Sequence, residues 1–270
     1  MTNILIIIAV LYIGFCLFFY FFQHFFFFRP EVLPSSFKFK YEFPFEELDF
    51  KMEDGGHLNV VYFKVPNSRG VIYYLKGNSR SVKGWGKFAK DFLSNGYDFI
   101  MLDYRGFGKS KGKRTEKTLF NDAQFLYKWI KERYDEEKIT VFGRSFGSGI
   151  AARIASWNNP NMLILDSPYY SFYHNVKRHA FFIPLKMLMR YPIRTDLFLK
   201  DFKHPIHIIH GSKDRLIPFS QSEKLQALYP QIQLYKIEGG KHNNLPEFEE
   251  FFEILYDILD INADTKITQE

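Results

Sequence analysis

The hydrophobic and polar positions beyond residue 56 alternate between short apolar runs and segments of helical spacing. Apolar or alternating runs of this length are typical of strands in a covered sheet, and they occupy residues 57–65, 71–75, 99–102, 139–142, 162–165, 206–209 and 233–237. Helical spacing predicts helices over residues 85–94, 118–134, 145–157, 221–228 and 248–259. Because strands and helices alternate, we predict an α/β fold whose mostly parallel sheet is covered by helices on both faces.

The first 28 residues have a different pattern. No charged residue lies between residues 4 and 22, and Gln23 and His24 are the only strongly polar interruptions before Arg29. About 20 apolar residues in a helix span the ~30 Å hydrocarbon core of a bilayer. A cleaved signal peptide would have a basic start, a shorter apolar run and small residues at its end, and this segment has none of them. We therefore predict a single-pass transmembrane anchor over residues 1–29.

Composition and charge narrow the class of protein. The 270 residues are 46% hydrophobic and 24% charged, which excludes global disorder. The single cysteine, Cys16, excludes an internal disulfide and a cysteine-based zinc site. The net charge is +6, but no dedicated basic tract is present, so we expect no nucleic-acid partner. Arg29, Lys38 and Lys40 follow the anchor and no basic residue precedes it, so we expect membrane lipid as a partner and a domain on the cytoplasmic side.

The predicted domain organisation follows from these patterns. After the anchor, residues 30–44 are expected to form a connector, and residues 45–265 a single α/β domain. In a parallel sheet, ligands bind at the carboxyl ends of the strands. Catalytic groups are therefore expected immediately after strands.

One motif meets that expectation. The stretch GRSFG places Ser145 between Gly143 and Gly147, after the strand at residues 139–142 and at the start of a helix. A sharp strand-to-helix turn needs residues without side chains beside the serine. The turn exposes the hydroxyl and directs the first amides of the helix toward any negative charge that forms beside it. We predict that Ser145 is a nucleophile and that the two glycines form its elbow.

A serine hydroxyl needs a base, and the later strands end in suitable residues. HGSKDRLIP follows one strand and contains Asp214, and IEGGKHNNL follows the last strand and contains His242. The order serine, aspartate, histidine along the chain is that of the α/β-hydrolases. In that scheme His242 accepts the proton of Ser145, and Asp214 orients the imidazole. Asp166 also ends a strand and is the alternative acid, although the family pattern favours Asp214.

Further stretches extend the resemblance. YYLKGNSRS, LDYRGFGKSKG and LDSPY match segments of the α/β-hydrolases, and the domain resembles the membrane-anchored serine hydrolases of the serine aminopeptidase-like branch. The resemblance implies an oxyanion hole formed by the amides of Asn78 and Phe146. Lys76 stands where relatives have histidine, and we expect its ammonium to reach solvent or a carboxylate, the alternative being an anionic group of the substrate. Asp103 is expected to bond backbone amides or an arginine.

The insertion at about residues 169–204 occupies the position of a lid in this superfamily. It is rich in aromatic residues, and between residues 167 and 195 it has no acidic residue and five basic ones: Lys177, Arg178, Lys186, Arg190 and Arg194. We predict a small helical lid that lines an apolar acyl pocket and touches the membrane surface. The alternative is an ordinary cover over the sheet.

These patterns lead to one functional hypothesis and one alternative. We predict a serine hydrolase that cleaves an ester or thioester bond, or an amide, through an acyl-enzyme, on a small-molecule, lipid-like or acylated substrate. The histidines lack a matching set of metal ligands, so we expect neither a metal nor a cofactor. The alternative is a non-catalytic binding protein with the same fold.

Overall fold

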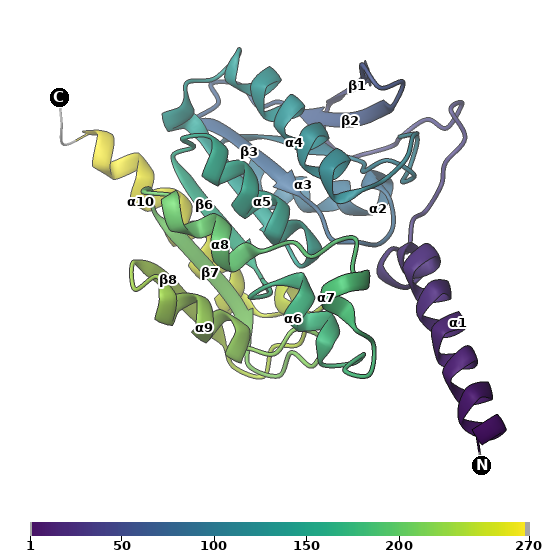
Figure 1. The fold of residues 1–270 in the computed structure, drawn as a ribbon. Coiled ribbons are helices and arrows are strands. Elements are labelled where there is room, and N and C mark those ends of the chain that lie inside the picture. The colour runs from purple at the N-terminus through teal and green to yellow at the C-terminus, as the bar shows by residue number, and fades with distance from the viewer. Residues whose placement is uncertain (1, 268–270) are drawn as a thin grey trace.

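The structure, a computed structural model, describes residues 2–267, within which eight strands form one sheet (Figure 1). The strand order across the sheet is β1-β2-β4-β3-β5-β6-β7-β8. Strand β2 is antiparallel to β1 and β4, and the other neighbours are parallel. The strands are β1 Phe45–Lys51, β2 His57–Phe63, β3 Gly70–Leu75, β4 Tyr97–Leu102, β5 Ile139–Arg144, β6 Met162–Asp166, β7 Ile206–Gly211 and β8 Ile232–Ile237.

Helices cover both faces of the sheet, which confirms the predicted fold class (Figure 1). One face carries α4 (Glu116–Lys131), α5 (Phe146–Trp157) and α9 (Ser220–Leu228). The other carries α2 (Val82–Trp85), α3 (Ala89–Leu93) and α10 (Glu249–Ile267). Side chains of a strand alternate between the two faces. Tyr73 accordingly packs in one core and Tyr74 in the other.

The predicted helix over residues 85–94 is not continuous. It is divided into α2, a 3₁₀ turn at Gly86–Phe88, and α3. The ring of Tyr41 packs against Gly86, where a Cβ would lie 2.4 Å from a ring carbon. Only a glycine leaves room for the ring at this position. A glycine inside an α-helix also lowers the stability of the helix by about 1 kcal/mol relative to alanine. Tertiary packing therefore outweighs the local helical spacing here.

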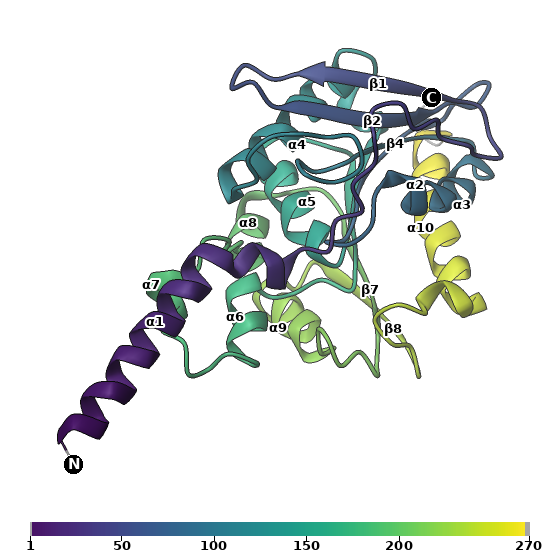
Figure 2. The same cartoon turned by 90° about the vertical axis from the view of Figure 1, so that its right-hand side faces the viewer.

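The N-terminal helix α1 (Thr2–Phe27) projects away from the domain (Figures 1 and 2). It is long and apolar enough to cross a membrane, and nearly all of its most apolar part is exposed. That exposure distinguishes it from the core helix of a soluble protein.

The chain that follows α1 lies against the carboxyl edge of the sheet. Arg29 forms a parallel bridge with Ser79, and Val32 forms one with Gly108. The bridges lie beside the loop that follows β3 and the turn that follows β4. The C-terminal end of α1 is therefore joined by backbone hydrogen bonds to the edge where the nucleophile lies.

The insertion after β6 forms short helices above the same edge. They are α6 (Phe172–Lys177), α7 (Leu185–Leu188), α8 (Thr195–Phe198) and a 3₁₀ turn at Leu199–Asp201. Helices α6 and α7 lie beside the part of α1 nearest the domain (Figure 2), and α7 contacts α1. We refer to this segment, residues 169–204, as the lid.

Candidate active site

Ser145 occupies the turn between β5 and α5 in a conformation that side chains rarely adopt, with φ at +52°. Its amide donates to the carbonyl of Asp166 on the next strand at 2.9 Å. A Cβ at Gly143 would lie 2.5 Å from the Cβ of Ala151, and a Cβ at Gly147 would lie 2.0 Å from a backbone carbonyl of β3. Both glycines are therefore needed for α5 to approach the sheet at this turn.

The structure brings the three predicted side chains together. The Ser145 hydroxyl lies 2.8 Å from Nε2 of His242. Nδ1 of the same imidazole lies 2.7 Å from Oδ2 of Asp214. The three residues are far apart in sequence, but each follows a parallel strand, β5, β7 or β8, at the same edge of the sheet. The arrangement can transfer a proton from the hydroxyl to the imidazole and stabilise the resulting positive charge.

The carboxylate of Asp214 is held by four donors. Its Oδ1 accepts from the amides of Leu216 at 2.9 Å and Ile217 at 2.8 Å, and its Oδ2 faces both His242 and His210. Burial by itself raises the pKa of this carboxyl, but the hydrogen bonds from His210 and His242 outweigh it and leave the pKa below its ordinary value. Asp214 is therefore ionised at neutral pH.

His210, which the sequence did not single out as functional, is a positioning residue for Asp214. Its Nε2 lies 2.8 Å from the carbonyl of Ile217 and 3.2 Å from Oδ2 of Asp214, and its Nδ1 lies 2.6 Å from the hydroxyl of Ser222. A carbonyl only accepts, so Nε2 carries the proton and Ser222 donates to Nδ1. The available signal was its place at the end of β7, four residues before Asp214.

The alternative acid, Asp166, has other partners. Its carboxylate is 3.1 Å from Nε of Arg144 and accepts from the hydroxyl of Ser167 at 2.8 Å. Asp166 and Arg144 are both buried, so this pair belongs to the structure of the elbow. The geometry favours Asp214 as the partner of His242.

The two residues predicted for the oxyanion hole flank the serine. Phe146 is the first residue of α5, whose amide has no acceptor within the helix. On the other side, a Cβ at Gly77 would lie 3.8 Å from the Cβ of Ser145, so the loop that contains Asn78 passes beside the nucleophile. The roles of these two amides remain a prediction.

The end of α1 holds this loop. The Asn78 side chain donates to the carbonyl of Phe27 at 2.5 Å, and the Asn78 carbonyl accepts from the amide of Arg29 at 2.9 Å. Arg80 donates its amide to the carbonyl of Arg29 at 2.9 Å. The last turn of α1 and the extended segment after it thus fix the position of the loop.

Lys76 is fully buried beneath the same loop and does not reach solvent. Its ammonium lies 3.4 Å from Asp103 and 3.9 Å from the centre of the Phe107 ring. Burial lowers the pKa of Lys76 and raises that of Asp103. Asp103 also accepts from the amide of Val82 at 3.0 Å, so its partners are a backbone amide and a lysine, where an arginine had been considered. The pair lies below the loop and has a structural role.

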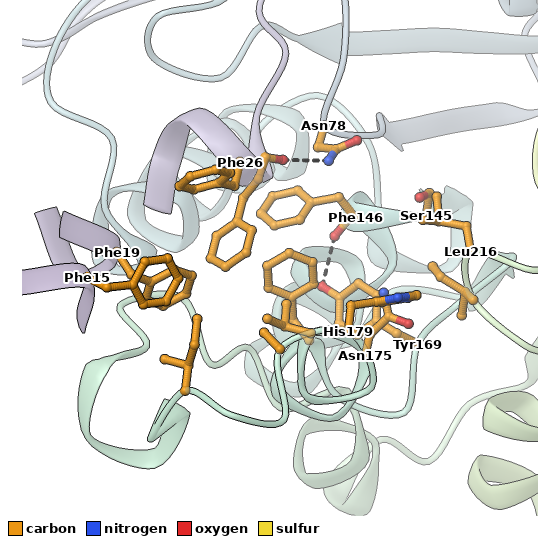
Figure 3. A pocket seen from close by; sticks show the side chains of 16 residues that line it. Phe15, Phe19, Phe26, Asn78, Ser145, Phe146, Tyr169, Asn175, His179 and Leu216 are labelled. Atoms are coloured by element: carbon orange, nitrogen blue, oxygen red, sulfur yellow. Dashed lines mark hydrogen bonds between the residues drawn. The ribbon is translucent and has the colours of Figure 1, made fainter. Parts of the chain in front are cut away.

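An apolar cavity of about 380 Å³ begins at Ser145 and extends toward α1. Figure 3 shows Ser145 at one end and Phe15 and Phe19 at the other, with Phe146 between them. Residues of α1, the loop after β3, the turn between β5 and α5, the lid and the loop after β7 line it: Phe15, Phe19, Phe26, Phe27, Asn78, Ser145, Phe146, Tyr169, Phe172, Asn175, Val176, His179, Ala180, Ile183, Leu216 and Ile217. The contribution of α1 was not anticipated from the sequence.

The described residues contain no group of three or more histidine, cysteine or acidic side chains placed to hold a metal ion.

Comparisons with known proteins agree with this architecture. A family model described as serine aminopeptidase, S33, matches residues 66–195. The chain is 31% identical over 204 residues to the lysophosphatidylserine lipase ABHD12 of Danio rerio. The aligned region covers 67% of this chain and 52% of the relative. The chain thus spans about half the length of that relative. It is also 27% identical to an uncharacterized protein of Mycobacterium tuberculosis, over 72% of this chain and 71% of that protein.

Solved structures show the same fold. The Pyrococcus furiosus esterase Pf2001 superposes with a TM-score of 0.68 at 22% identity, covering 86% of this chain and 98% of the esterase. Est1E from Butyrivibrio proteoclasticus, solved with ferulic acid, superposes with a TM-score of 0.63 at 17% identity, covering 82% of this chain and 99% of that one.

Proposed function

We propose that this chain, which belongs to the α/β-hydrolase superfamily, is a serine hydrolase that cleaves an ester or thioester bond through an acyl-enzyme. The observation that carries the proposal is the 2.8 Å contact between the Ser145 hydroxyl and Nε2 of His242, beside an apolar cavity that opens at the same hydroxyl.

The geometry supports a sequence of two acyl transfers. His242 takes the proton of Ser145 as the oxygen attacks the substrate carbonyl. The amides of Phe146 and Asn78 stabilise the oxyanion, and each such donor contributes roughly 10²–10³ in rate. As the tetrahedral intermediate collapses, the bond to the leaving oxygen or sulfur breaks, and His242 returns the proton to that atom. Water, activated by the same imidazole, then cleaves the acyl-enzyme and restores Ser145 while Asp214 stabilises the imidazolium.

We further propose a lipid-like substrate. The cavity is lined mainly by aromatic and aliphatic side chains. The Danio rerio relative is named a lysophosphatidylserine lipase, so an acyl ester of a lipid is the favoured substrate class. We retain the proposed organisation: a membrane anchor over residues 1–29, a connector over 30–44, and a hydrolase domain over 45–265, with the lid facing the membrane and the domain on the cytoplasmic side.

Covalent labelling tests the proposal against the alternative of a non-catalytic binding protein. The full chain in detergent should react with a fluorophosphonate probe and hydrolyse p-nitrophenyl esters, and Ser145→Ala should abolish both. Ser156→Ala is the matched control, because Ser156 lies on the same helix and its hydroxyl bonds to Arg153. Equal labelling of wild type and Ser145→Ala would refute the assignment of the nucleophile, and failure of the wild type to label would favour the binding protein.

A further inference from the structure

The apolar cavity is bounded on one side by the helix predicted to cross the membrane. Phe15, Phe19, Phe26 and Phe27 line it from α1, and Ser145 closes its other end (Figure 3). Phe19 and Phe27 are buried against the domain, whereas most of α1 is exposed. One face of α1 is therefore part of the wall of the cavity.

The attachment of α1 to the lid is specific, because it uses the only fully buried polar side chain of the helix. The Gln23 amide nitrogen donates to the carbonyl of Leu188 at 2.9 Å, and its oxygen accepts from the amide of Arg190 at 2.9 Å. Farther along, the hydroxyl of Tyr12 donates to the carbonyl of Phe182 at 2.7 Å. A polar group in an apolar helix is costly unless it has a partner. The lid supplies these partners, so residues 180–190, here called the lid loop, lie along α1.

With Gln23 placed at the headgroup level of a bilayer, the lid loop would extend to about the middle of the hydrocarbon core. Tyr12 precedes Gln23 by 11 residues, which corresponds to about 16 Å along a helix, or roughly half of a ~30 Å hydrocarbon core. At that level Phe182 is 51% exposed and its neighbour Phe181 is 78% exposed. Arg190, by contrast, lies near the domain end of α1, with its guanidinium 5.7 Å from the centre of the Tyr20 ring. The exposed phenylalanines thus lie toward the N-terminal half of α1, and the Arg190 charge lies near Gln23 at the domain end of the helix.

We infer that the lid loop and the Phe15–Phe19 face of α1 form an intramembrane wall, and that an acyl chain of a membrane lipid enters the cavity sideways from the leaflet. This inference rests on the proposed function. The acyl chain would pass from the hydrocarbon of the leaflet into an apolar cavity without exposure to water. Its entry therefore carries no hydrophobic penalty. Phe19 lies eight residues before Phe27, about 12 Å along the helix. The cavity therefore runs from leaflet depth to Ser145, where the ester carbonyl would lie.

A depth measurement tests the position of the lid loop independently of catalysis. A nitroxide is attached at Phe182→Cys in a Cys16→Ala background, with the full chain reconstituted in phosphatidylcholine vesicles. We expect the label to be accessible to oxygen and shielded from a water-soluble nickel chelate, as for a label at Tyr12→Cys. A label at Ser212→Cys, on a loop of the domain, is the aqueous control. Equal access of nickel to positions 182 and 212 would overturn the inference, whether or not the chain is an enzyme.

A kinetic comparison tests the wall itself. Phe19→Ala is compared with Phe22→Ala, which removes the same side chain from a position of α1 outside the cavity lining. Phe19→Ala should lower kcat/KM for a long-chain acyl ester roughly tenfold relative to a butyryl ester, as expected for a change in an apolar subsite. Phe22→Ala should leave that ratio unchanged. If both variants are active and have the same ratio of long-chain to butyryl kcat/KM, α1 does not contribute to the acyl site. The proposed hydrolase activity would be unaffected by that result.

Discussion

Replacing Asp214 by asparagine tests which carboxylate serves His242. The backbone amides of Leu216 and Ile217 both donate to Oδ1, at 2.9 and 2.8 Å. The oxygen of an asparagine would stay at that position, because only an acceptor satisfies two amides. Its NH₂ group would then face Nδ1 of His242, where Oδ2 now accepts at 2.7 Å. Two donors cannot pair, so the imidazole would carry its proton on Nε2 and could not accept the proton of Ser145.

The expected effect is large. In a serine triad, loss of the correct tautomer lowers kcat by about 10⁴, which corresponds to about 5 kcal/mol of transition-state stabilisation. Substitution by alanine would also leave the two amides without an acceptor, at about 1–3 kcal/mol of folding stability for each. Asparagine therefore separates the catalytic effect from the structural one.

The assay is kcat for p-nitrophenyl butyrate per folded molecule, with the folded fraction taken from circular dichroism. Asp166→Asn is the matched control. It breaks a buried pair with Arg144 and should cost about 3–5 kcal/mol of stability, yet kcat of its folded fraction should stay within about tenfold of wild type. If Asp166→Asn lowered kcat as much as Asp214→Asn, or if Asp214→Asn retained most of the activity, the assignment of the acid would be wrong.

Three further substitutions test other parts of the structure. Gly147→Ala places a Cβ 2.0 Å from a carbonyl of β3. The variant should lose about 1–3 kcal/mol of stability and react less with the fluorophosphonate probe. A variant with the melting temperature and labelling of the wild type would contradict the elbow geometry. Asn78→Ala removes the hydrogen bond to Phe27 and loosens the oxyanion loop, so kcat should fall by about ten- to a hundredfold for short and long esters alike, and an effect on KM alone would refute that role. Burial lowers the pKa of His207 from 6.5 to about 4, so the folded state favours the neutral ring and loses stability as the pH falls from 6.5 through 4. His207→Gln should therefore gain about 3 kcal/mol relative to wild type over that interval in urea titrations, and parallel pH profiles would contradict it.

Much of the domain could be predicted because its strands and helices have distinct periodicities. The predicted strand at residues 139–142 matches β5 (Ile139–Arg144), and the predicted helix at 118–134 matches α4 within a few residues. The sequence also predicted that Ser145, Asp214 and His242 lie close together, because each follows a strand. Parallel strands end at one edge of a sheet, so residues that follow them converge whatever their separation in sequence.

The errors arose where remote segments meet. The spacing at residues 85–94 predicted one helix, but Tyr41 packs against Gly86 and the helix is interrupted. The expectation that Lys76 reaches solvent or a carboxylate is confirmed in its second form, because its ammonium lies 3.4 Å from Asp103. The complete burial of the side chain was not predicted, and only the packing around it shows it. Local pattern does not report such neighbours, because it records whether a position is apolar and not which segment covers it.

The sequence alone determined the class of fold, the elbow around Ser145 and an apolar N-terminal helix, because each depends on residues that are neighbours along the chain. Only the tertiary structure decided that His210 supports Asp214 and that α1 lines the cavity and holds the loop of Asn78. Gln23 illustrates the difference. In the sequence it is a polar interruption in an apolar run, and its significance comes from the carbonyl of Leu188 and the amide of Arg190. Those partners are more than 160 residues away and are brought beside it only by folding of the lid against the helix.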